Sequence, residues 1–165
     1  MAHITQQEIA GILRVYMGSA ALDSQPDFPG FLAKKFTSWL YIDKTLDQMR
    51  EDLHQDLMLC IFAASGRTMK LRMDDGRLGV WTEDAVDALA DCLLEVLFYH
   101  LPRTDYTYRA LFDYALRHQS HSAFKALYLY YDAFHQPADR TYLIRMIREQ
   151  FAPADYQRWL DAADA

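Results

Sequence analysis

The stretch Thr82–Leu101, TEDAVDALADCLLEVLFYHL, decides the fold. Thr82 is a helix-capping residue, and Glu83 and Asp84 follow it in the first turn, where the helix dipole favours acidic side chains. Pro102 ends the stretch, because the residue before a proline is disfavoured in the helical conformation. The few polar residues fall in one line, and nearly all the others are apolar. A helix that is apolar around most of its circumference is predicted to lie at the centre of a domain.

The spacing of the apolar residues is different in the segment before this helix. Between Thr68 and Trp81 apolar residues alternate, and Asp75 and Gly76 form a strong two-residue turn signal, because both tolerate positive φ better than most residues. We therefore expect a short β-hairpin whose apolar face lies on a helix, since an isolated hairpin is marginal in water. The turn predicts three cross-strand pairs: Asp74 with Arg77, Met73 with Leu78, and Leu71 with Val80.

Amphipathic patterns predict further helices on both sides of the hairpin. The first begins at a capping box formed by Thr5 and Glu8, and a second helical region runs from about 30 to 65 with a bend near Asp43. The predicted helices after Pro102 cover about 105–118, 121–135 and 139–150, with a short one starting at Pro153.

These elements predict an all-α fold, an antiparallel bundle of six or seven helices with one short β-hairpin inserted near 68–81. We expect a single helical domain over residues 1–165, because a chain of this length matches the usual size of one domain. The predicted core includes Leu53, Leu57, Cys60, Leu89, Leu93, Leu97, Leu111, Leu127 and Ile147.

The charge balance excludes some partner classes. The chain holds 17 Lys and Arg against 23 Asp and Glu, a net charge of -6, so we expect no general affinity for nucleic acid or anionic lipid. Arg67, Lys70, Arg72 and Arg77 on the hairpin are interpreted as a solvated face. The longest nearly uncharged apolar run, Leu57–Ala64, is far shorter than the ~20 residues of a membrane span. A basic protein partner is compatible with this balance.

The cysteines and the first residues predict a cytoplasmic location. Cys60 and Cys92 lie in apolar helical runs, which favours reduced, buried thiols over a disulfide framework. The first residues lack the basic and apolar segments of a signal peptide. The six glycines are scattered and form no phosphate-binding loop, and we expect no cofactor.

Two histidine patterns raise the question of metal binding. Glu51 and His54 form one Glu-x-x-His step, but a di-iron carboxylate bundle needs two such steps. A helical-bundle metalloenzyme using Glu51, His54 and the stripe from Asp87 to Glu95 is therefore an alternative hypothesis. His118 and His121 flank a turn, and a helix-end histidine followed by a serine cap accounts for them better than zinc does. We expect no metal.

Two sets of residues are candidates for partner binding. The first is an acidic stripe on one helix, which is also compatible with an ordinary solvent-facing edge. The second is a set of tyrosines outside the predicted core stripes, which are either exposed for binding or buried on a second side of their helices. The candidates are Asp84, Asp87, Asp91, Glu95, Tyr106, Tyr114, Tyr128 and Tyr130.

The lack of a catalytic motif, the acidic balance and the excess of tyrosine favour a non-catalytic protein-binding module. The most concrete hypothesis is an intracellular immunity- or antitoxin-type inhibitor of a basic toxic enzyme. An adaptor or regulatory subunit fits the same features, and the metalloenzyme above stays a further alternative.

Overall fold

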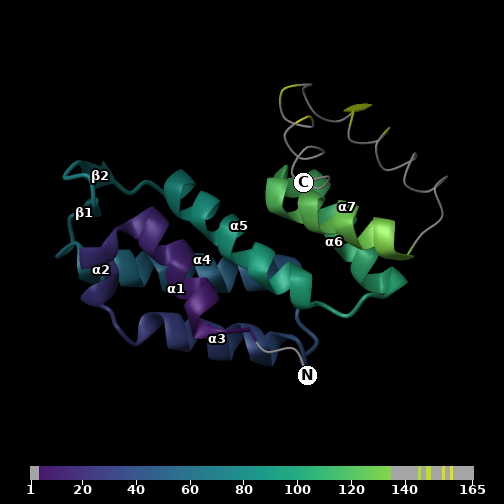
Figure 1. The fold of residues 1–165 in the computed structure, drawn as a ribbon, viewed down its shortest axis with the longest axis horizontal. Coiled ribbons are helices and arrows are strands. Elements are labelled where there is room, and N and C mark those ends of the chain that lie inside the picture. The colour runs from purple at the N-terminus through teal and green to yellow at the C-terminus, as the bar shows by residue number, and fades with distance from the viewer. Residues whose placement is uncertain (1–3, 135–144, 146–147, 150–153, 155–156, 158–165) are drawn as a thin grey trace. The chain divides into compact units, whose positions relative to one another are not determined.

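The structure is a computed structural model. It describes residues 4–134 and, beyond them, 145, 148, 149, 154 and 157; within these, the side chains at 105 and 128–134 are left undescribed. Ile147 and most of the helices predicted over 139–150 and from Pro153 lie outside the described residues. The chain forms two compact units, Met1–His100 and Leu101–Ala165 (Figure 1). The single domain stays a prediction.

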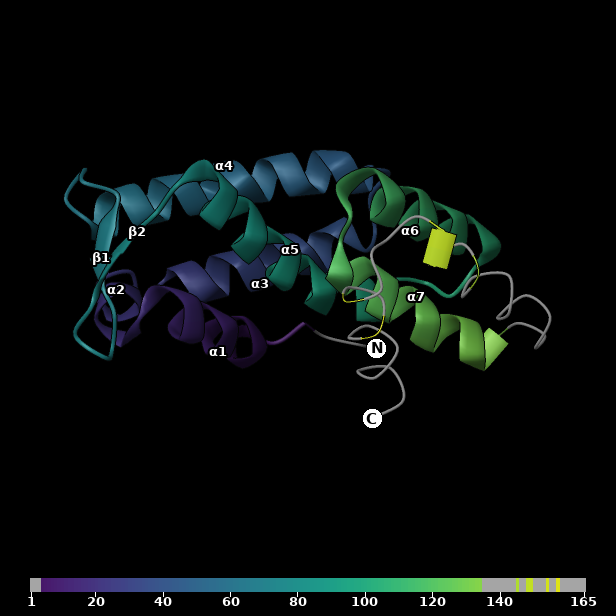
Figure 2. The same ribbon diagram turned by 90° about the horizontal axis from the view of Figure 1, so that it is seen from above.

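The first unit is built around α5 (Glu83–His100), the helix predicted to be central. One side of α5 contacts α1 (Gln6–Met17), which also packs on α3 (Phe28–Trp39), and another side contacts α4 (Leu46–Ala64), as the views in Figures 1 and 2 show. All six core residues predicted in this unit are buried: Leu53, Leu57, Cys60, Leu89, Leu93 and Leu97.

Capping residues explain where the helices of the first unit begin. Thr5 and Glu8 form the predicted capping box of α1. The region predicted over 30–65 is two helices, and α4 restarts at a second capping box, formed by Thr45 and Gln48, rather than at Asp43. A short helix that the patterns did not predict, α2 (Ser19–Asp23), follows α1 after Gly18.

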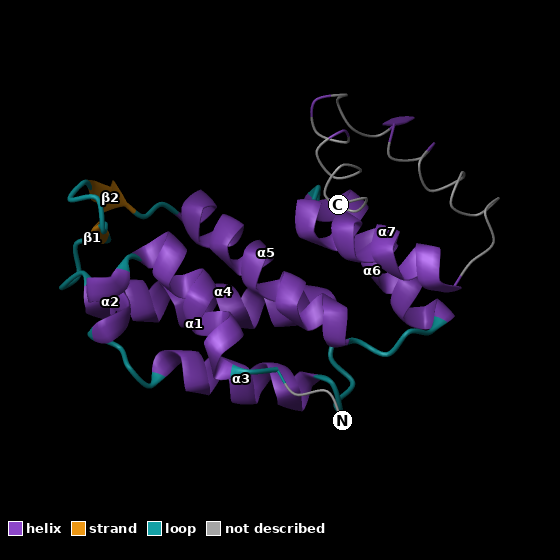
Figure 3. Cartoon of the chain, in the orientation of Figure 1, coloured by secondary structure: helices purple, strands orange, loops and turns teal. Residues whose placement is uncertain are grey.

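The predicted hairpin is present, but its predicted register is wrong by one residue (Figure 3). Strand β1 (Lys70–Arg72) pairs with β2 (Leu78–Val80) so that Leu71 lies opposite Gly79. The reason is the loop: the Met73 amide donates to the Arg77 carbonyl, and Gly76 lies at φ 86, so three residues rather than two form the turn.

The shifted register changes what each side chain of the hairpin does. Leu71 is buried, whereas Leu78 and Val80, predicted on the same face, are exposed. Asp74, predicted opposite Arg77, instead accepts two hydrogen bonds from Ser19 at the start of α2, from the amide at 2.7 Å and from the hydroxyl at 3.0 Å. The hairpin is thereby attached to the corner between α1 and α2.

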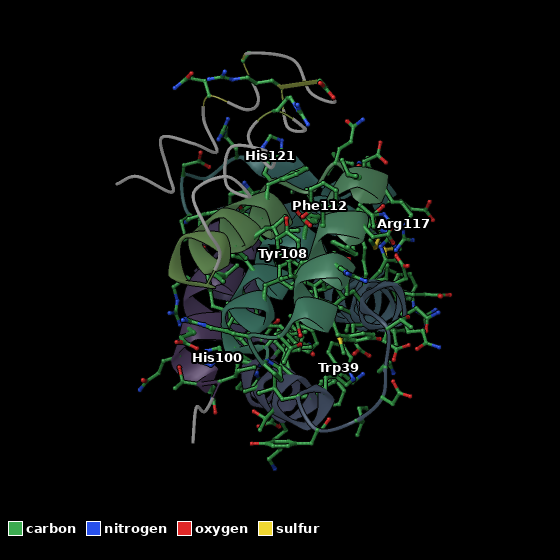
Figure 4. All side chains as sticks on the ribbon, turned by 90° about the vertical axis from the view of Figure 1, so that its right-hand side faces the viewer. Trp39, His100, Tyr108, Phe112, Arg117 and His121 are labelled. Atoms are coloured by element: carbon green, nitrogen blue, oxygen red, sulfur yellow. The ribbon has the colours of Figure 1, made fainter. Side chains whose placement is uncertain are left out.

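The second unit contains the two helices predicted over 105–118 and 121–135, α6 (Asp105–His118) and α7 (His121–Phe134), which pack on each other. The turn between them follows the sequence prediction, because Ser120 accepts the Ala123 amide and caps α7. Leu111 and Leu127 are buried as predicted. The rings of Tyr108 and Phe112 stack on α6, with centroids 6.2 Å apart (Figure 4).

Seven helices and one two-stranded sheet in the described part of the chain confirm the predicted all-α fold with a hairpin. Over that same part, the search for a helix with the length and apolar character of a membrane span finds none.

Candidate protein-binding face

The negative charge of the protein belongs to the first unit. Residues 1–100 hold 9 Lys and Arg against 15 Asp and Glu, whereas residues 101–165 hold 8 of each kind. Within the first unit, α5 carries five carboxylates and no lysine or arginine. The helix at the centre of the first unit is therefore also the most acidic element of that unit.

The four acidic residues of the predicted stripe do not share one environment. Asp84 is exposed and lies in the first turn of α5, where its charge favours the helix. Asp87 is turned toward α4, where one carboxylate oxygen lies 2.7 Å from Nδ1 of His54 and 3.9 Å from an Nη atom of Arg50. Because Asp87 joins two helices, its first role is structural.

Asp91 and Glu95 are half-exposed on α5, beside a tyrosine of α1. The Tyr16 hydroxyl lies 3.0 Å from Sγ of Cys92, and a hydrogen bond joins them. The pKa of Tyr16 is raised to about 12, first by this hydrogen bond, then by burial, and then by neighbouring charges, including those of Glu95 and Asp91. These carboxylates therefore lie within electrostatic reach of the Tyr16 ring.

The side chains along this seam form a surface that we call the α1–α5 face. Tyr16 is 40% exposed, and Val15, the residue before it, is 76% exposed. The Tyr16 side chain thus lies beside the carboxylates of Asp91 and Glu95. The α1–α5 face consists of Tyr16, Asp84, Asp91, Cys92 and Glu95.

Sequence reasoning missed two members of this face, Cys92 and the more exposed Tyr16. The spacing of Tyr16 places it in the apolar stripe of the first helix, and a stripe residue is expected in the core. Tyr16 lies at the edge of that stripe, where an aromatic ring can be half-covered while its hydroxyl finds a polar partner. The position of Tyr16 at the edge of the stripe was the signal from which its partial exposure could have been predicted.

The predicted tyrosines belong to the second unit, and the acidic stripe belongs to the first. Tyr106 is 76% exposed, as a binding residue should be. Tyr114 is fully buried, with its ring 4.5 Å from that of His118, so its predicted role on a binding surface is wrong. Tyr128 and Tyr130 lie on α7, and their side chains are outside the description.

The error at Tyr114 has a simple geometric cause. Helical spacing predicts a core stripe of α6 that consists of Tyr108, Leu111, Phe112 and Ala115 and leaves Tyr114 outside it. The buried row instead runs through Thr107, Leu111, Tyr114 and Ala115, while Tyr108 and Phe112 are only half-buried. Rotating the buried side of the helix by less than one residue step is enough to move Tyr114 into the core.

The cysteine thiols are reduced and disfavour the reactive thiolate form. Burial raises the pKa of Cys60 to about 12. Burial is also the main reason that the pKa of Cys92 is raised, and the hydrogen bond with Tyr16 opposes it in part. Neither thiol has the electropositive surroundings that activate a cysteine nucleophile.

The candidate metal ligands are only partly brought together. His54 contacts Asp87, whereas Glu51 is exposed on α4. Within the described residues, no group of three or more His, Cys, Asp and Glu side chains is placed to hold a metal ion. The metalloenzyme hypothesis therefore stays a prediction, with His54 and Asp87 as its one observed pair.

No family model, no curated protein and no solved structure matches this chain.

Proposed function

We propose that this protein is a non-catalytic protein-binding module whose α1–α5 face binds a basic protein. In its most specific form, the proposal is a cytoplasmic inhibitor of the immunity or antitoxin type that acts on a basic toxic enzyme. The observation that carries the proposal is α5 itself, which has five carboxylates and no lysine or arginine, with Asp91 and Glu95 beside the exposed Tyr16 ring.

Charge and apolar area have separate roles in such a face. Carboxylates on one line raise the rate at which a cationic partner arrives, and this effect weakens as salt is added. Tyr16 then offers contact area at small cost in side-chain entropy, which slows dissociation. An inhibitor needs both, because it must reach its target quickly and stay on it.

The first test is affinity capture from the native lysate with the unmodified protein and with Asp84→Lys/Asp91→Lys. Asp87 is left unchanged, because its carboxylate contacts His54 and its reversal would disturb the α4–α5 contact. A basic protein retained by the unmodified chain and lost by the variant is the expected result. Asp23→Lys/Asp43→Lys is the matched control, since it makes the same change in net charge at exposed sites away from α5.

The purified partner then separates an inhibitor from an adaptor. An inhibitor lowers the catalytic activity of the captured enzyme at equal molar amounts, and the unmodified protein does so better than the α5 variant. Salt should slow association, and Tyr16→Ala should speed dissociation. A captured partner that binds both variants equally, or that is itself acidic, contradicts the proposal.

A further inference from the structure

The second half of α4 is apolar around its whole circumference. Residues 57–64 read LMLCIFAA, a pattern typical of a helix that is covered on every side. The inward residues Leu57, Cys60 and Ile61 are buried in the first unit. The outward ones are not, because Leu59 is 68% and Phe62 43% exposed, and Ala63 beside them is exposed as well. We call Leu59, Phe62 and Ala63 the α4 patch.

Opposite charges lie at the two ends of the α4 patch. Glu51 is exposed two turns before Leu59, which is about 12 Å along the helix axis. Arg67 and Lys70 are exposed just beyond the end of the helix. The outer side of α4 therefore runs from acidic through apolar to basic.

We propose that a second copy of this chain covers the α4 patch, with the two α4 helices antiparallel about a two-fold axis near Leu59. This arrangement places Leu59 and Phe62 of both copies together and brings Glu51 of each copy to Arg67 of the other. A parallel arrangement would set Glu51 against Glu51. A two-fold interface requires a surface that is complementary to itself. A surface that is acidic at one end and basic at the other meets this requirement only when the two helices are antiparallel.

Sedimentation velocity of the full chain over a concentration series tests the proposal. We expect a reversible monomer–dimer equilibrium, and Leu59→Lys should weaken it by about tenfold or more, because it places two cations at the centre of the interface. Val15→Lys is the matched control, since Val15 is 76% exposed on a different helix, outside both the α4 patch and the α1–α5 face, and its change should leave the equilibrium unaltered. Circular dichroism and the melting temperature show that each variant is folded.

A charge swap tests the antiparallel arrangement. Glu51→Lys and Arg67→Glu should each weaken the dimer severalfold, and the double variant should restore it, because the pair is remade with its signs exchanged. Arg14→Glu, an exposed reversal on α1, should have no effect. A chain that stays monomeric, a dimer that Leu59→Lys leaves intact, or a double variant without rescue overturns the proposal. None of these outcomes bears on the α1–α5 face, which is tested by partner capture.

Discussion

Two glycines of the first unit differ in the backbone conformation they adopt. Gly11 is inside α1, whereas Gly66 follows α4 at φ 61, and a Cβ at either site meets nothing within 4 Å. We expect Gly11→Ala to raise the free energy of unfolding by about 0.5 to 1 kcal/mol, because glycine is a poor helix former. Gly66→Ala should lower it by about 1 to 2 kcal/mol, because a side chain disfavours the left-handed region. Urea denaturation measures both, and changes of the same sign would contradict the argument.

Tyr16 offers a test of the geometry at the α1–α5 seam. The hydrogen bond with Cys92 and burial raise the pKa of Tyr16 from the ordinary 10.0 of a tyrosine to about 12 in the folded protein. A raised pKa favours the folded state fully below pH 10, and this contribution is lost as the pH rises through 12. The phenolate absorbance of the unmodified protein minus that of Tyr16→Phe should therefore titrate near pH 12. Cys92→Ala should lower that value, because the hydrogen bond with Cys92 is its largest cause; an unchanged titration would place Tyr16 elsewhere.

At the scale of elements, the link between Asp74 and Ser19 holds the hairpin to α2. Asp74→Ala removes both hydrogen bonds to Ser19, so we expect a loss of about 1 to 2 kcal/mol in the free energy of unfolding. Asp75→Ala is the matched control, because the neighbouring carboxylate is exposed and bonds only within the loop, to Arg77. Its effect should be within about 0.5 kcal/mol. Equal losses in the two variants would contradict this role of Asp74.

Local signals predicted the elements better than they predicted the contacts between them. Thr5 and Thr82 predicted the starts of their helices, because the side chain of a capping residue accepts a hydrogen bond from an amide only three positions away. The hairpin register depended instead on whether two or three residues formed the loop, and Asp-Gly is compatible with both. Helical spacing puts Asp87 in line with Asp84, Asp91 and Glu95, but its contact with His54 joins residues 33 positions apart, which no helical pattern reveals.

At the scale of the molecule, the first unit has its own core, which includes Leu13, Phe36, Leu53, Leu89 and Leu97. We therefore expect a chain of residues 1–100 to fold without the rest, with a helical circular dichroism spectrum and a cooperative thermal transition. It should also carry the whole net charge of -6, which its electrophoretic mobility reports. A fragment that melts without a cooperative transition would favour the single domain that the length of the chain predicts.

Because the Ser19 amide is bonded to Asp74, hydrogen exchange at this one amide reports how often the hairpin detaches from α2. Ser19 is the first residue of α2, and an amide in a first turn has no acceptor within its own helix. Its shelter from solvent deuterium therefore comes from the Asp74 carboxylate, at 2.7 Å, on a segment 55 residues away. The exchange rate of the Ser19 amide therefore measures local opening between the hairpin and α2. The exchange rates of the α5 amides measure the opening of the core of the first unit.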